Sequence, residues 1–329
     1  GLIVSSILDQ VVTVGVESTY GTAQTSTVRS FEAKADTFQR DVEYIQSIGF
    51  RRDLQTVRSD RDDTVSLGAS GSIECDILNK GQGLLLQHVL GTTSGPTQNG
   101  STTAYKSTFS TDDTGPTGSY TVQMSRVDNT GTLRPFTYEG CVATGFNISQ
   151  ELGANLSMSI DFDAENEQTS TGEATPAYPS SADPFNYTQS VIAIDGSAAT
   201  NFTSFSLDGD LGMKTDRRFL AGSATKAQPK RTSVPSYTGT ISAEFASLTD
   251  YNKFINGTVF SINASWTGAS IESPWTYEFV VSIPVAKFTG STPVASLDDL
   301  TVIDLPFTIL DGGSGAAMSF FYTSTDTSL

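Results

Sequence analysis

The sequence has little of the chemistry that metal sites and most enzymes need. Its 329 residues include one histidine, His88, and two cysteines, Cys75 and Cys141. Zinc sites take about four Cys, His or acidic ligands, and a catalytic triad needs a histidine beside its nucleophile, so neither fits this composition. We interpret the cysteines as buried free thiols and His88 as an interface or surface residue. We therefore expect no enzyme, no cofactor and no metal.

Basic residues are also scarce. The chain has 19 Lys and Arg against 36 Asp and Glu, and its net charge is −17. Proteins that grip nucleic acid use basic groups to displace counterions from phosphate, so tight binding is excluded, although nucleic acid can still slide past. A halophilic host and a locally acidic surface or lumen are two explanations of the acidic surplus.

Long apolar runs are missing as well. No segment approaches the roughly 20 apolar residues that cross a bilayer, and the first residues have no basic leader, so we expect no membrane segment and no signal peptide. A pepsin-like protease would need an Asp-Thr-Gly or Asp-Ser-Gly turn in each of two lobes. The chain has Asp113-Thr114-Gly115 and no second such turn, which argues against that class.

What the sequence does have is alternation of apolar and polar residues. Leu156 to Asp163 is the cleanest case, with apolar residues at even positions and polar ones at odd positions. The same pattern covers residues 202–207, 238–245 and 300–309, and clusters of Gly, Pro, Asn and Asp separate the segments. Such period-two alternation predicts strands with one buried face, and therefore a mainly β protein.

Part of the sequence also has the pattern of an internal repeat. Four short matches recur in the same order: Ser30-Phe31 with Ser204-Phe205, Gly71-Ser72-Ile73 with Gly239-Thr240-Ile241, Gly91-Thr92 with Gly257-Thr258, and Thr137-Tyr138-Glu139 with Thr276-Tyr277-Glu278. A diverged duplication explains them, and the alternative is chance in a chain rich in Ser, Thr and Gly. Duplication favours self-assembly or pseudo-symmetry over a single catalytic centre. We expect two tandem β-sandwich or barrel repeats, each with one short flanking α-helix.

These repeats predict five parts of the chain. They are an N-terminal arm (1–27), a first repeat (28–165), a linker (166–200), a second repeat (201–312) and a C-terminal tail (313–329). Asn79 is the expected cap of the first helix and Gly91 its end, while Ser247 or Thr249 is the expected cap of the second helix and Gly257 its end.

Each repeat also has a long polar stretch, Gln39 to Asp63 and Met213 to Ser236, and the two hold most of the basic residues. Stretches of this length predict an extended hairpin or a loop that grips a neighbour. A solvated mobile loop is the alternative.

The residues from Val14 to Ala23, Val-Gly-Val-Glu-Ser-Thr-Tyr-Gly-Thr-Ala, carry a resemblance. They are similar to the start of tail tube (major tail) proteins of long-tailed, non-contractile viruses of the siphovirus type, where a Glu-x-x-Tyr-Gly-Thr-Ala stretch precedes the first sheet strand. The resemblance implies repeats of tail-tube type. It further implies that copies pair through strand edges into rings, and that the rings stack through long loops into a hollow tail tube that passes viral DNA.

The same resemblance implies partners and a location. The partners are further copies of the chain, the tape measure and tail terminator proteins, and double-stranded DNA that passes without tight binding. The location is the virion tail, after assembly in the host cytoplasm. Many members of that family have one sandwich per chain and six chains per ring, so two repeats predict three chains with pseudo-six-fold symmetry. A cell-surface adhesin or carbohydrate-binding β-sandwich is the alternative function.

Two sets of residues are candidates for this function. The predicted channel-lining residues are Glu32, Asp36, Asp161, Asp163, Asp208 and Asp210, because they alternate with apolar neighbours. The predicted contacts between rings are Arg51, Arg52, Arg58, Arg61, Arg217, Arg218, Lys230 and Arg231, from the two polar stretches. The alternative for the carboxylates is that they face outward and keep the tube soluble.

Overall fold

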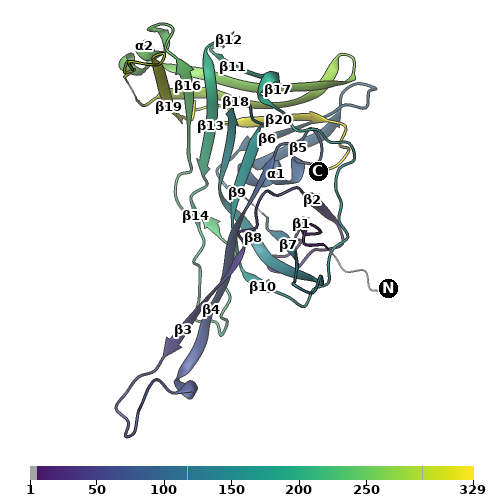
Figure 1. Ribbon diagram of the computed structural model, residues 1–329, viewed down its shortest axis with the longest axis vertical. Helices are drawn as coiled ribbons and strands as arrows, with labels where there is room; N and C mark the ends of the chain where they lie inside the picture. The colour runs from purple at the N-terminus through teal and green to yellow at the C-terminus, as the bar shows by residue number, and fades with distance from the viewer. Residues whose placement is uncertain (1–5, 117, 291) are drawn as a thin grey trace.

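The computed structural model describes residues 6–116, 118–290 and 292–329. The chain is mainly β, as the alternation predicts, and its large antiparallel sheets do not close into a barrel. The arrangement is consistent with a β-sandwich (Figure 1). Within the described residues, no helix is long and apolar enough to span a membrane.

Eight strands run side by side through both predicted repeats, and we call them the eight-strand sheet. Their bounds, in spatial order, are β3 (Gln39–Gln46), β4 (Asp62–Asp76), β9 (Ser157–Ala164), β8 (Leu133–Glu151), β13 (Phe202–Asp210), β16 (Ser236–Glu244), β19 (Val302–Ile309) and β18 (Trp275–Phe288). The first four strands come from the first repeat and the last four from the second.

The two halves of the eight-strand sheet follow the same plan. In the first half β3 pairs with β4, β4 with β9 and β9 with β8; in the second, β13 pairs with β16, β16 with β19 and β19 with β18. The matched Ile73 and Ile241 fall at equivalent places, because Ile73 lies opposite Ile160 while Ile241 lies opposite Leu305. The match of Ser30-Phe31 with Ser204-Phe205 does not, because the first pair lies in β2 and the second in β13, whose equivalent is β3. The halves join where β8 pairs antiparallel with β13. This repeated order supports the duplication.

The remaining strands complete the sandwich, and several lie in the predicted N-terminal arm (1–27), the linker and the C-terminal tail. Their bounds are β1 (Val11–Val16), β2 (Val28–Phe31), β5 (Gly91–Gln98), β6 (Tyr105–Thr111), β7 (Tyr120–Val127), β10 (Asn166–Gln168), β11 (Ser190–Ile194), β12 (Ser197–Ala198), β17 (Val259–Glu272) and β20 (Ser319–Ser324). Strand β1 pairs with β2 and β7, and β11 pairs with β17. The C-terminal strand β20 lies between β18 and β6, so it ties the second repeat to a hairpin of the first.

The core follows from the alternation. Along β9, Met158, Ile160 and Phe162 are buried while the serines and aspartates between them are not. One continuous cluster of buried apolar side chains runs through both repeats. In the second repeat it centres on Trp266, whose Nε1 donates a hydrogen bond to Gln150 Oε1 at 3.0 Å. The buried polar atom is thus satisfied, as such atoms generally are in native proteins.

The two helices differ in burial. Helix α1 (Gly83–Leu90) is almost wholly buried, whereas α2 (Thr249–Asn256) has no fully buried residue. Helix α2 ends at Gly257 in the left-handed region, as predicted, and α1 ends at Gly91, also at positive φ.

Three details of the helix prediction are wrong. Asn79 does not cap α1, which begins after Gln82; the Asn79 side chain instead accepts a hydrogen bond from the N–H of Asp183. His88 is not a surface residue, because it is 4% exposed and its Nε2 accepts a hydrogen bond from the N–H of Ala143 at 3.0 Å. Beside α2, the Ser247 hydroxyl accepts a bond from the N–H of Thr249, although the cap position itself is Leu248.

The first polar stretch is an extended hairpin, as predicted. Strands β3 and β4 continue past the sandwich as a two-stranded arm (Figure 1), and a 3₁₀ turn (η1, Ser59–Arg61) lies just before β4. The second stretch contains only a short ladder of β14 (Met213–Lys214) and β15 (Lys230–Arg231). It folds back on the first repeat, where the carbonyl of Ala224 accepts a hydrogen bond from the N–H of Leu67. A second 3₁₀ turn (η2, Tyr187–Gln189) precedes β11.

Candidate assembly and channel surfaces

The eight-strand sheet has one polar face, opposite the core. Gly145 of β8 lies between Asp161 of β9 and Asp210 of β13. Two residues along β8, Asn147 lies opposite Asp208 and donates a hydrogen bond to its Oδ1 at 2.7 Å. Three of the predicted channel carboxylates are therefore neighbours on this face. Partial burial raises the pKa of Asp161, although the residue as a whole is exposed on the sheet surface.

Asp163 lies on the same face but is already paired. Lys226, from the second polar stretch, places Nζ 2.6 Å from Asp163 Oδ1, and the two side chains are 8% and 14% exposed. Burial raises the pKa of Asp163, and the Lys226 ammonium opposes that rise. This carboxylate fixes a loop to the sheet rather than facing solvent.

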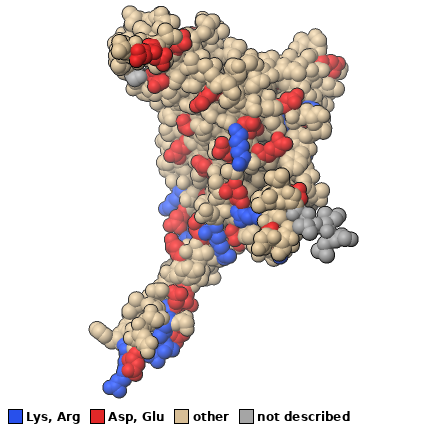
Figure 2. Space-filling model, viewed as in Figure 1, with Lys and Arg blue, Asp and Glu red and all other residues tan. Residues whose placement is uncertain are grey.

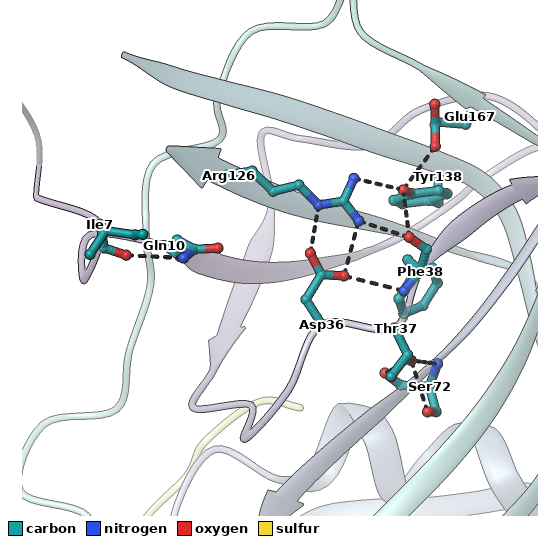
Figure 3. A network of polar contacts seen from close by, with 9 residues as sticks. All are labelled: Ile7, Gln10, Asp36, Thr37, Phe38, Ser72, Arg126, Tyr138 and Glu167. Atoms are coloured by element: carbon teal, nitrogen blue, oxygen red, sulfur yellow. Dashed lines mark hydrogen bonds and ion pairs between the residues drawn. The ribbon is translucent and has the colours of Figure 1, made fainter. Parts of the chain in front are cut away.

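Glu32 and Asp36 lie away from these four aspartates. Asp36 forms a two-pronged ion pair with Arg126 of β7, at 2.5 and 2.9 Å, and accepts a further bond from the N–H of Phe38. Arg126 also donates to the Tyr138 hydroxyl at 3.1 Å (Figure 3). Asp36 thus ties the segment before β3 to β7. Glu32 is exposed next to β2.

The polar face holds acidic residues that the candidate set missed. Asp41 of β3 accepts a hydrogen bond from Ser70, Glu74 lies opposite Ser159, and Asp304 of β19 accepts one from Ser242 at 2.7 Å. Alternation in β3, β4 and β19 would have identified them. No described residue of β4, β9, β13, β16 or β19 is Lys or Arg, nor is any residue of β8 from Val142 to Glu151. The face is acidic and hydroxyl-rich throughout.

The arm carries the first set of predicted contacts between rings at its tip. Ile48 and Phe50 are 71% and 114% exposed there, and the tip encloses a hollow of about 660 Å³. Arg51 and Arg52 make no ion pair with any described residue. Arg58 pairs with Asp60 at 2.8 Å, and its hydrogen bond lowers the pKa of Asp60 to about 2. The tip is therefore apolar, basic and largely unpartnered.

The second predicted set is bound within its own chain. Arg218 donates to the carbonyl of Leu67 at 2.9 Å, and Arg231 donates to the carbonyls of Leu211 and Asp112. Arg217 donates to the carbonyl of Gln228, while Lys230 of β15 is exposed. Most of this set therefore holds the second stretch in place, in contrast to the arm.

The Glu-x-x-Tyr-Gly segment folds around one buried carboxylate. Glu17 is 7% exposed and accepts hydrogen bonds from the N–H groups of Gly21 and Gly140, at 3.0 and 2.9 Å. The hydroxyls of Ser119 and Thr121 donate to it as well. One side chain thus ties β1 to β7 and β8. No group of His, Cys, Asp and Glu in the described chain could hold a metal ion.

A family model described as phage tail tube protein matches residues 8–309 of this chain. The match begins within the predicted N-terminal arm, covers the first repeat and the linker, and ends three residues before the end of the second repeat. No curated protein matches the sequence.

Proposed function

Since this chain belongs to the phage tail tube protein family, and is thus a structural component of the virion tail, we propose that its copies close into rings that stack into the hollow tube of a siphovirus-type tail. Viral DNA passes through the tube without tight binding. Tape measure and tail terminator proteins are the expected partners, and assembly takes place in the host cytoplasm. The acidic surface suits a halophilic host as well. The family match favours this function over an adhesin or sugar-binding protein and over an enzyme.

The observation that carries the proposal is the junction of β8 with β13. It joins the last strand of one half of the eight-strand sheet to the first strand of the other half. The equivalents of these strands are β18 and β3. Strand β3 pairs only with β4 among the described strands, whereas β18 is already paired with β17 from Trp275 to Lys287, so a further partner can pair only beyond Lys287. An unpaired strand edge is a template for another chain. A head-to-tail contact of β3 with the segment of the next copy that directly follows β18, at Thr289, would repeat the internal junction and close a ring.

Strand number favours three chains per ring. Three copies supply 24 strands, which at about 4.8 Å spacing and about 40° tilt make a barrel roughly 48 Å across between backbones. Six copies would make one of roughly 96 Å by the same geometry. The narrower barrel still leaves room for a DNA duplex inside its side chains. Three chains of 34.9 kDa give a ring of about 105 kDa, and native mass separates this from a six-chain ring.

The internal junction also predicts which residues meet. Asp210 of β13 lies opposite Gly145 of β8. Gly68 and Ser236 are equivalent, because each lies five residues before the matched Ile73 and Ile241. Asp41 lies opposite Gly68 and Asp210 lies opposite Ser236, so Asp41 is the equivalent of Asp210. Asp161 of β9 and Pro306 of β19 are equivalent, because they directly follow Ile160 and Leu305. Gly145 lies opposite Asp161, and the N–H of Thr289 donates to the carbonyl of Pro306, so Thr289 is the equivalent of Gly145. Asp41 of one copy should therefore lie opposite Thr289 of the next.

A disulfide tests this contact. With Asp41→Cys and Thr289→Cys in one chain, oxidised rings should run as covalent trimers on a non-reducing gel, because directly opposed residues lie within disulfide reach. The native cysteines are both buried and do not interfere. The matched control, Glu43→Cys with Thr289→Cys, is two residues out of register and should not cross-link. Intact rings without cross-linking in the first variant would place the ring contact elsewhere.

A further inference from the structure

The end of the molecule that carries α2 exposes apolar side chains, which we call the α2-end patch. Leu248 and Ile255 of the α2 region are 55% and 58% exposed, and Leu297 and Leu300, before β19, are 97% and 64% exposed. The two segments lie together, because the N–H of Phe245 donates to the carbonyl of Thr301 at 2.9 Å. Exposed apolar surface of this kind marks interaction sites.

The α2-end patch is also acidic. Asp250 belongs to α2, and Asp298 and Asp299 lie between the two exposed leucines of the loop. Lys253 is the one cation of α2, and it already lies near Asp250 and Asp195, at 3.8 and 3.9 Å. Figure 2 shows acidic side chains gathered at this end of the molecule, whereas the far arm carries both basic and acidic ones. A ligand for the patch should therefore be apolar and positively charged.

The tip of the arm has that chemistry. Phe50 and Ile48 are exposed, and beside them Arg51 and Arg52 have no ion-pair partner within the described chain. The tip and the α2-end patch lie at opposite ends of the long axis of the molecule (Figure 1). One chain cannot bring them together, but two chains stacked in the same direction can.

Among the described residues, each chain has one such arm and one such patch. The second polar stretch also exposes Phe219 and Leu220, but Lys226 and Arg218 bind it to the first repeat, so it does not extend from the sandwich as the arm does. The first helix cannot serve as a further patch, because α1 is covered by its own chain, with the Leu329 side chain against Gly83. Divergence of the repeats has thus left one donor and one acceptor per chain.

We infer that the arm tip of each chain docks on the α2-end patch of a copy in the adjacent ring, with Phe50 against the leucines and Arg51 and Arg52 beside Asp298 and Asp299. This inference rests on the proposed tube. The contact joins two different surfaces, so it does not close on itself and extends in one direction without limit. It replaces a self-complementary contact between the two polar stretches as the connection between rings.

Charge exchange tests the inference. The first variant combines Arg51→Asp with Arg52→Asp, and the second combines Asp298→Arg with Asp299→Arg. Each should form rings of normal mass, because neither site lies at the predicted Asp41–Thr289 junction, but electron microscopy at low ionic strength should show no tubes. The chain with all four changes should form tubes again. Arg134→Asp, which reverses another exposed arginine, should leave tubes unchanged.

The outcomes separate this inference from the proposal on which it rests. Normal tubes from the arginine variant would overturn the inference, as would its loss of rings, since the tip would then act within a ring. Failure of the fourfold variant to recover tubes would show that the arginines dock on another surface. If the unmodified chain forms neither rings nor tubes, the proposed function itself fails.

Discussion

The Glu17 carboxylate accepts a hydrogen bond from the backbone N–H of Gly140 at 2.9 Å, across 123 positions of the sequence. Because the same carboxylate also accepts the N–H of Gly21 and the hydroxyl of Thr121, it fixes the entry of the chain against two strands of the first repeat. The role of Glu17 in the segment that resembles tail tube proteins is thus structural. It supplies an acceptor for several buried donors that lack another partner of equal strength.

Replacing Glu17 should therefore cost stability rather than any specific activity. Glu17→Ala leaves buried N–H groups unpaired, and we expect the free energy of unfolding to fall by about 2–3 kcal/mol. Urea denaturation of the unassembled chain measures this. Glu32→Ala, at an exposed site, is the control and should stay within about 0.5 kcal/mol of the unmodified chain. Equal loss in both variants would show that the hydrogen bonds to Glu17 are unimportant.

The strands and their repetition could be predicted from the sequence because both depend on local patterns. Alternation from Leu156 to Asp163 fixes which side chains of β9 are buried, whatever its neighbours. The prediction that His88 is an interface or surface residue is wrong, because α1 is apolar on nearly all sides, a pattern that indicates a buried helix.

Contacts between distant segments had no such signal. The partner of Lys226 lies 63 positions away, and the place of β20 between β18 and β6 depends on the whole fold. The candidate site was thus predictable where it follows strand alternation, as for Asp161, Asp208 and Asp210. It was not predictable where a loop returns to cover it, as at Asp163.

The pair of Lys226 and Asp163 should be important for stability. Lys226→Met leaves a buried carboxylate without its counter-ion, which typically costs about 3–5 kcal/mol. Combining it with Asp163→Asn removes that charge, so we expect most of the loss to be recovered. Urea denaturation of both single variants and the double variant gives the coupling, and additive losses would contradict the pairing.

The pH dependence of Lys226→Met has a definite sign. Burial already raises the pKa of Asp163, and loss of the ammonium raises it further. A carboxyl with a raised pKa binds its proton more tightly in the folded chain. The variant should therefore recover stability relative to the unmodified chain as the pH falls toward the carboxyl range. A stability difference that does not change with pH would contradict this assignment.

Buried His88 should make the fold sensitive to mild acid. Burial lowers its pKa to about 3 from an ordinary value of 6.5. Between these values the unfolded chain binds the proton and the folded chain does not, so stability falls as the pH is lowered through this window. The contribution is up to about 1.4 kcal/mol per pH unit. His88→Gln keeps an acceptor for Ala143 but cannot titrate, so its stability should fall less between pH 6.5 and 4. Parallel curves for the two chains would refute the effect.

The acidic face of the eight-strand sheet leads to a prediction about DNA passage. If this face lines the channel, its carboxylates repel phosphate, and no described residue of β4, β9, β13, β16 or β19, nor of β8 from Val142 to Glu151, is a Lys or Arg that could hold it. Replacing Asp161, Asp208 and Asp210 with Lys would turn neighbouring repulsive sites into phosphate contacts. Asp163 is left unchanged, because its pairing with Lys226 stabilises the fold.

Particles with the triple lysine variant should therefore eject their genomes more slowly, and the effect should be largest at low ionic strength, where screening is weakest. Ejection rates across a salt series, on particles with normal tails by electron microscopy, measure it. The matched control changes the charge equally at three exposed acids off this face, Asp9→Lys, Asp113→Lys and Glu173→Lys. If both variants eject at the unmodified rate, the acidic face does not line the path. If the control slows ejection as much, net charge rather than the channel wall governs passage.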